Sequence, residues 1–191
     1  MLTSEQLSFI SSKRNFQIKN EVDEIVGQLL YDFQHKLTEL LESNAIQLPT
    51  KVSKLPGKIS KGNNHKGYPF QVSDFPANFS QENIFTFRST IWYGNFFSFA
   101  LIVSGIPKNE FDIQKPNLQQ GEHYFSLNET VWDTHFDASS ASLLTLQTLE
   151  DNISQIKKSS HLKIFRVFEM NQIHSFNRLG IDCFKDLFAT N

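Results

Sequence analysis

The sequence predicts an α+β fold with a mainly antiparallel β-sheet, two N-terminal helices, one helix after the central strands and a short C-terminal helix. Three observations support this class. Helix-like and strand-like segments are segregated along the chain, which favours an antiparallel sheet over alternating β and α units. Gly94-Asn95 separates two β-rich runs, which is typical of a hairpin. Eleven of the 25 aromatic residues lie between Tyr68 and Phe99, so this segment is expected to form the centre of the core.

The chain is expected to form a single domain, 1–191. Its length, with 39% apolar and 20% charged residues, is ordinary for one globular unit. We divide it into a helical N-terminal part (1–43), a basic loop (44–67) and a sheet with helices (68–191). Proline and glycine residues interrupt regular structure in the middle part.

Two helices are expected at the N-terminus. Thr3 and Gln6 fit a capping box for a first helix near residues 4–14. Asn20 is expected to cap a second helix of about six turns. The apolar face of that helix is expected to pack on the sheet, and a helix–helix seam in a homodimer is the alternative. Apolar residues at spacings of three and four define this face: Val22, Ile25, Val26, Leu29, Leu30, Phe33, Leu37, Leu40 and Leu41.

The basic loop is a candidate anion site. It carries five lysines and no acid. Lys58, Lys61 and His65, together with free backbone N–H groups, are suited to holding a phosphate or carboxylate. The alternative is a solvated loop with no ligand.

The strongest local pattern is the hairpin Ile84–Ser104. A two-residue turn at Gly94-Asn95 would pair Tyr93 with Phe96. Both faces of the pair would then be apolar, which predicts a central position in the sheet. In this register Arg88 faces the same way as Trp92 and Leu101.

The later elements follow in order. Strands are expected near residues 122–136 and at Leu162–Phe168. Between them, Ser139 or Ser140 is expected to cap a helix that ends at Lys157 and Lys158. Asp182 is expected to cap the short C-terminal helix.

Arg88 marks a second candidate binding site. A guanidinium in apolar surroundings needs a partner, because its desolvation costs several kcal/mol. The partner is a carboxylate, from Asp74, Glu122 or Asp133, or it is a bound anionic ligand beside Trp92.

A metal site is a weaker alternative. His135 and Asp137 form a His-x-Asp pair, and His174 follows at a distance, as in the facial triad of non-haem iron oxygenases. Asp137 also has a structural explanation near the start of a helix. We therefore expect no metal and no cofactor.

Composition narrows the classes of partner. A net charge of -2, and the presence of only one basic residue, Arg88, among the aromatic strands, argue against nucleic-acid binding. No apolar run is long enough to cross a bilayer, and no secretory signal is recognised at the N-terminus. Cys183 is the only cysteine, so no internal disulfide is expected. These observations favour a cytoplasmic protein without membrane contact.

One stretch resembles a known family. It contains the runs 58–70 (Lys-Ile-Ser-Lys-Gly-Asn-Asn-His-Lys-Gly-Tyr-Pro-Phe), Ser73-Asp-Phe-Pro, and Asn83-Ile-Phe-Thr-Phe-Arg-Ser-Thr-Ile-Trp-Tyr-Gly-Asn-Phe-Phe-Ser. Residues 58–105 thereby resemble a family of uncharacterised bacterial proteins. That family has no assigned activity, so the resemblance implies no function.

The function expected from the sequence is binding rather than catalysis. The leading interpretation is a ligand- or partner-binding protein with an aromatic-rich sheet and an anion site at Arg88, Trp92, Lys58, Lys61 and His65. The alternatives are a homodimeric structural or adaptor protein and a metal-dependent enzyme that uses His135 and Asp137.

Overall fold

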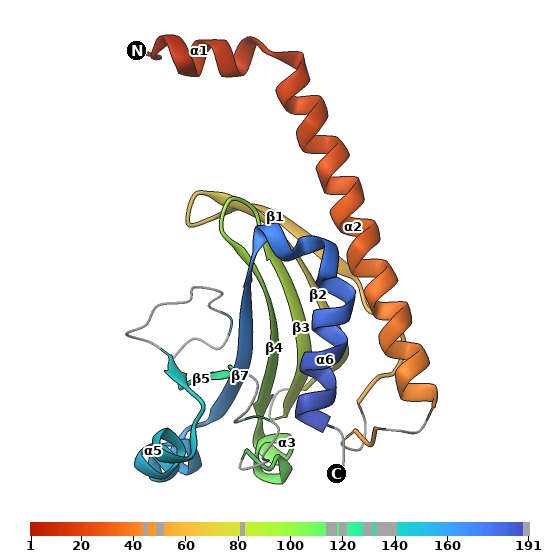
Figure 1. Cartoon of the computed structure of the whole chain (residues 1–191), viewed down its shortest axis with the longest axis vertical. Helices are drawn as coiled ribbons and strands as arrows, with labels where there is room; N and C mark the ends of the chain where they lie inside the picture. The colour runs from red at the N-terminus through yellow and green to blue at the C-terminus, as the bar shows by residue number, and fades with distance from the viewer. Residues whose placement is uncertain are drawn as a thin grey trace.

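The computed structural model describes residues 1–43, 46–48, 52–80, 83–113, 118, 122–127, 132 and 141–188. Its centre is a seven-stranded antiparallel sheet with the order β1-β2-β3-β4-β7-β5-β6. Two long helices, α2 and α6, lie side by side on one face of this sheet (Figure 1). The predicted α+β class is therefore confirmed.

The elements have the following bounds. The helices are α1 (Ser4–Ser11), α2 (Lys13–Glu42), α3 (Gly105–Glu110), α5 (Leu146–Lys158) and α6 (Phe176–Phe188), with a 3₁₀ helix η1 (Met170–Ser175) before α6. The strands are β1 (Ile59–His65), β2 (Tyr68–Phe79), β3 (Ile84–Trp92), β4 (Phe96–Ser104), β5 (Tyr124–Ser126), β6 (Ser142–Leu143) and β7 (His161–Glu169).

The capping box of α1 is confirmed, and the predicted start of α2 is wrong. Thr3 Oγ1 accepts a hydrogen bond from the Gln6 amide, and Gln6 Oε1 accepts one from the Thr3 amide. Helix α2 begins at Lys13 rather than at Asn20. No glycine or proline lies between these two positions, so nothing stops the helix from extending toward α1.

Part of the predicted basic loop is a strand. β1 pairs with β2 at the edge of the sheet, and Gly62 lies opposite Phe70. A side chain at Gly62 would overlap the Phe70 ring. The strand was not recognisable because all its residues after Ile59 are polar or glycine, which an edge strand tolerates.

The central hairpin is confirmed, but its predicted register is wrong by one residue. Trp92 pairs with Phe96, and the loop has three residues. The amide of Asn95 donates to the Trp92 carbonyl at 3.1 Å, and Gly94 adopts a φ of 72°. A positive φ at the third position of a turn is the conformation that glycine favours. Arg88 and Trp92 therefore face the side of Ser98 and Ala100, away from the helices.

The helices pack on a layer of phenylalanine rings. Phe33 of α2 lies 5.3 Å from Phe99 and 5.5 Å from Phe176 between ring centroids. Phe184 of α6 lies 5.0 Å from Phe87. A Cβ at Gly180 would overlap both Phe33 and Phe99. The absence of a side chain at this position thus allows α6 to approach α2 and the sheet closely.

Replacing Phe97 by alanine tests the position of the core. Phe97 is fully buried on β4, so we expect Phe97→Ala to lower the free energy of unfolding by roughly 3–5 kcal/mol in urea denaturation. Phe79→Ala is the control, because Phe79 is 55% exposed and should lose about 1 kcal/mol or less. A similarly small loss for Phe97→Ala would contradict the packing described.

Candidate functional site

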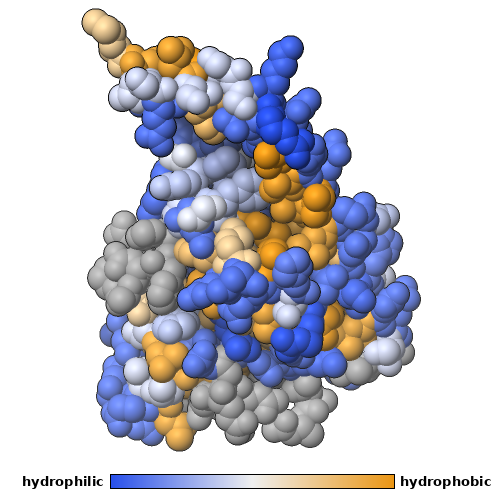
Figure 2. Space-filling view, turned by 45° about the horizontal axis from the view of Figure 1, so that its top comes forward, coloured by the Kyte–Doolittle hydropathy of each residue, from blue (hydrophilic) through white to orange (hydrophobic). Residues whose placement is uncertain are grey.

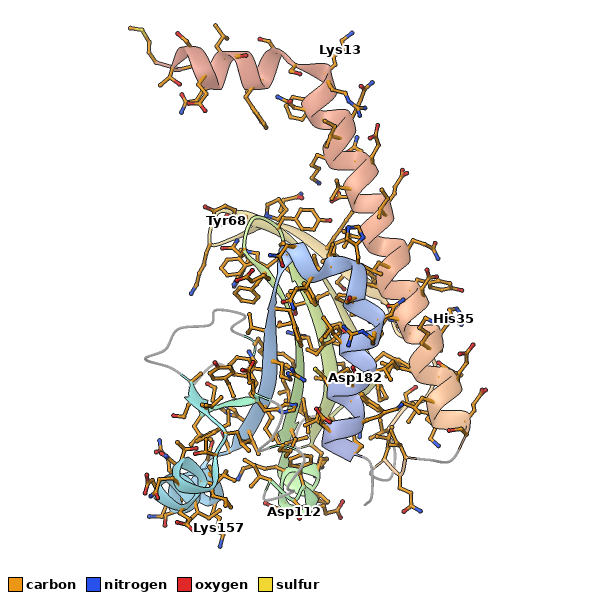
Figure 3. All side chains as sticks on the ribbon, viewed as in Figure 1. Lys13, His35, Tyr68, Asp112, Lys157 and Asp182 are labelled. Atoms are coloured by element: carbon orange, nitrogen blue, oxygen red, sulfur yellow. The ribbon has the colours of Figure 1, made fainter. Side chains whose placement is uncertain are left out.

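The N-terminal part of the molecule stands clear of the sheet. We call α1 together with residues 13–25 of α2 the N-terminal arm. Figure 1 shows it projecting beyond the sheet, and Figure 3 shows side chains around Lys13 pointing into open space. Its large apolar side chains are between 37% and 67% exposed. They are Leu7, Phe9, Ile10, Phe16, Ile18, Val22 and Ile25.

A polar network holds the arm where it leaves the sheet. Asp23 receives Lys19 Nζ at 2.6 Å on one carboxylate oxygen and the Tyr93 hydroxyl at 3.0 Å on the other. The Gln71 amide donates to the Asp23 carbonyl at 2.8 Å and to the Tyr93 oxygen at 2.9 Å. These bonds tie α2 to β2 and to the β3–β4 turn, so they fix the direction of the arm.

The same contacts set the charges of this network. Burial alone would raise the pKa of Asp23, but hydrogen bonds from Lys19 and Tyr93 hold it below its usual value. Burial raises the pKa of Tyr93, and its bond to Asp23 acts in the same direction. At neutral pH the carboxylate is therefore charged and the phenol protonated, as the hydrogen bond between them requires.

An apolar groove lies beside the arm. Its volume is about 610 Å³. One wall is α2, and the other is formed by the β3–β4 turn and η1. Figure 2 shows hydrophobic residues gathered on this side of the molecule and on α1. The lining residues are Val22, Ile25, Val26, Leu29, Ile91, Tyr93, Gly94, Met170, Ile173 and His174.

The groove exists because α2 carries two apolar stripes. Val26, Leu30, Phe33, Leu37 and Leu41 are buried against the sheet and α6. A second stripe includes the residues directly before Val26 and Leu30. Because neighbouring residues point about 100° apart on a helix, the second stripe is turned by that angle from the first. It consists of Ile18, Val22, Ile25 and Leu29. This spacing of four, three and four is that of a helix-pairing seam, and in the structure Val22, Ile25 and Leu29 line the groove.

A basic cleft adjoins the groove between α2 and α6. It includes Lys36, His174, Arg178 and Lys185, with Asp182 as its acid. Arg178 Nη1 lies 3.5 Å from Asp182 Oδ2. Since His174 lines both spaces, the groove has a positively charged neighbour at one end.

Arg88 has its partner within the protein. Its Nε and Nη2 atoms donate to the two carboxylate oxygens of Asp74, both at 2.8 Å. The hydroxyl of Thr86 also donates to Asp74, at 2.9 Å. The Trp132 ring lies 4.6 Å from the guanidinium carbon. The predicted pairing of Arg88 with Asp74 is confirmed, and two of its guanidinium nitrogens are thereby occupied. Asp133, another predicted partner, lies outside the described residues.

The other predicted ligand residues are only partly brought together. Trp92 is buried, and its ring lies 5.1 Å from the His65 ring. Its indole N–H donates to the His65 carbonyl at 3.2 Å. Lys61 instead lies 3.8 Å from Asp23, and Lys58 is exposed. Anion binding by this set stays a prediction.

The predicted metal ligands are mostly outside the described residues. His135 and Asp137 fall there, while His174 is exposed at the end of η1. Within the described residues no group of three or more His, Cys, Asp or Glu side chains could hold a metal ion. The metal-site hypothesis thus gains no geometric support from His174.

A buried polar cluster lies under α6. His123 Nε2 and Arg166 Nη1 lie 3.9 Å and 3.7 Å from Asp186 Oδ2. Burial, together with the charge of Arg166, lowers the pKa of His123 to about 4. Burial also raises the pKa of the Cys183 thiol to about 12. The thiol is therefore protonated at neutral pH and a poor nucleophile.

Comparisons with known proteins do not identify the chain. No family model, no curated protein and no solved structure matches it. The resemblance of residues 58–105 to bacterial proteins therefore stays a prediction. In the described part of the chain, no helix is long and apolar enough to span a membrane.

Sequence reasoning missed the groove, although one signal was available. The apolar face of α2 contains the neighbouring pairs Ile25-Val26 and Leu29-Leu30. Neighbouring residues point about 100° apart, so such a face is too wide for one sheet contact. Met170 and Ile173 carry no comparable signal, because only the fold brings η1 next to α2.

The Arg88–Asp74 pair can be tested by breaking it. In Arg88→Met the Asp74 carboxylate keeps its hydrogen bond from Thr86 but loses its cation. We expect a loss of about 1–3 kcal/mol in chemical denaturation, because both side chains remain partly hydrated. The double variant Arg88→Met/Asp74→Leu should recover part of that loss. Unchanged stability of the single variant would show that the pair is not structural.

The lowered pKa of His123 predicts that the folded protein loses stability in mild acid. Its pKa is about 4 when folded and about 6.5 when unfolded. Its contribution is complete above about pH 6.5 and falls as the pH drops toward 4, because the unfolded chain binds the proton first. For this group we expect a loss of about 2 kcal/mol between pH 7.5 and pH 5. Urea denaturation at both pH values should show a smaller loss for His123→Leu, and equal losses would contradict the assignment.

Proposed function

We propose that this chain is a binding protein that receives an amphipathic helix of a protein partner in the groove beside α2. The observation that carries the proposal is an apolar groove of about 610 Å³ with a helix-pairing stripe along one wall. Apolar grooves of this kind receive the apolar faces of helices, whose contacts recur at spacings of three and four. The cytoplasmic location expected from the sequence fits this function.

The exposed wall of the groove favours a macromolecular partner over a small molecule. Ile25 is 67% exposed, and Val22 is 37% exposed. Exposed apolar residues that form one continuous patch mark interaction surfaces more often than isolated ones do. The groove continues upward into the arm, so a partner that covered both would be elongated, as a helix is.

The basic cleft favours a partner helix that carries acidic residues. Lys36, Arg178 and Lys185 lie next to the end of the groove that His174 lines. A helix with an apolar stripe and acids on its flank would place the stripe in the groove and the acids near these cations. Arg88 has no part in this proposal, because Asp74 already fills its guanidinium fork.

Selection of helical peptides tests the proposed function. A display library of amphipathic helices, with the apolar and flanking positions randomised, is selected on the full-length protein. We expect enriched peptides to carry apolar residues at three- and four-residue spacing with acidic flanks. Their binding should fall at least about tenfold with Ile25→Glu, which places a charge in the groove wall.

Leu146→Glu is the matched control, since Leu146 is 63% exposed and belongs to α5, away from the groove (Figure 1). It should leave binding unchanged. Enrichment of no peptide by a monomeric protein, whose groove is open, or of peptides that bind Ile25→Glu as well as the unaltered protein, would overturn the proposal.

A further inference from the structure

We infer that the helix received by the groove is the N-terminal arm of a second copy of this chain, so that two copies exchange arms in a symmetric homodimer. This inference rests on the proposed function and names its partner. The arm and the groove belong to the same chain, and each lacks an apolar contact that the other provides.

The arm needs a partner to be stable as a helix. Helix α1 has eight residues, and helices shorter than about 12–15 residues are marginal in water on their own. Its local support is modest: a capping box at Thr3, a ring contact between Phe9 and Phe16 at 5.8 Å, and a hydrogen bond from the Asn15 side chain to the Phe9 carbonyl at 3.1 Å. Burial of the seven exposed apolar side chains of the arm would supply what is missing.

The apolar area of the arm is of the size that a dimer requires. A fully covered aromatic side chain buries about 150–250 Å² and an aliphatic one less, so the seven side chains, two of them aromatic and all about half exposed, present roughly 500–700 Å². A stable interface buries about 800 Å² on each partner. In a two-fold arrangement each copy gives one arm and receives one, so both surfaces are covered at once.

The arm of the same chain is too short to fill the groove. Helix α1 spans about 12 Å at 1.5 Å per residue. The α2 residues of the groove, Val22–Leu29, lie nine to sixteen residues below Lys13, which is about 14–24 Å along the helix. If α1 folded back along α2 from Ser12, it would end at about the upper rim of the groove. A second copy has no such restriction.

The charges of the arm favour a protein surface over a lipid membrane as its binding partner. Three bases, Lys13, Arg14 and Lys19, are outnumbered by four acids, Glu5, Glu21, Asp23 and Glu24. Helices that lie on anionic membranes carry an excess of lysine and arginine on their polar face. An arm with exposed acids instead suits the basic cleft beside the groove.

Two complementary variants test the exchange of arms. Leu7→Glu/Ile10→Glu places charges on one side of α1 and leaves the groove unchanged. Ile25→Glu places a charge in the groove wall and leaves α1 unchanged. All three positions are more than half exposed, so the variants should fold, and circular dichroism with thermal melting checks this.

The readout is the mass in sedimentation equilibrium between about 1 and about 100 μM. We expect a dimer for the unaltered chain and for the Leu146→Glu control. Each complementary variant alone should be monomeric. A one-to-one mixture of the two should form a heterodimer, because α1 and residues 13–24 of the Ile25→Glu copy are unaltered and meet the intact groove of the other copy.

Three results would overturn the inference: a monomer at all concentrations, dimers that persist in both variants, or a mixture that stays monomeric. The peptide selection separates this failure from failure of the proposed function. A monomeric protein that still enriches groove-binding helices would have a different partner, whereas a monomer that enriches none would refute both.

Discussion

The close packing of α2 and α6 on one face of the sheet is the contact on which the rest of the structure depends. It is possible because Gly180 leaves room for the rings of Phe33 and Phe99. The buried stripe of α2 is aligned with the sheet by this contact, and Gln34 secures it with a 2.6 Å hydrogen bond to Ser73. With the rotation of α2 fixed in this way, Leu29 of the second apolar stripe packs against the core, but Val22 and Ile25 stay exposed. The groove is thus a consequence of the core, since one helix carries more apolar surface than one sheet face covers.

The hydrogen-bond network around Asp23 fixes the position of the apolar surface of α2 that the core does not cover. It lies where α2 leaves the sheet, and it joins the helix to both β2 and the β3–β4 turn. Below it the helix is held by the core, and above it the helix projects as the arm. A hydrogen-bonded carboxylate at this position gives the arm a direction, which a purely apolar contact would not do. The arm and the groove are thereby presented in a fixed relation to each other.

The fold class was predictable because it depends on the spacing of apolar residues along the sequence. The groove was not predictable, since it depends on which distant segments the fold brings together. The capping box at Thr3, the hairpin at Gly94 and the strand around Ile164 have local signals, and they are found. The register failed because a loop of three residues instead of two turns every following side chain to the other face. Asp74 was among the expected partners of Arg88, but no local pattern could select it. The groove joins residues about 150 positions apart in sequence, such as Val22 and Ile173, and no local pattern reports such a contact.

Amide hydrogen exchange of the intact protein at two concentrations tests the central claim most directly. Protection of a backbone amide reports how rarely its segment opens. If a second copy covers the arm, the amides of residues 4–25 should be protected, and their protection should rise with protein concentration. The amides of residues 26–41 should not change, because the core of the same chain holds that half of α2. Fast exchange throughout residues 4–25 at both concentrations would show an arm without a partner and would contradict the account.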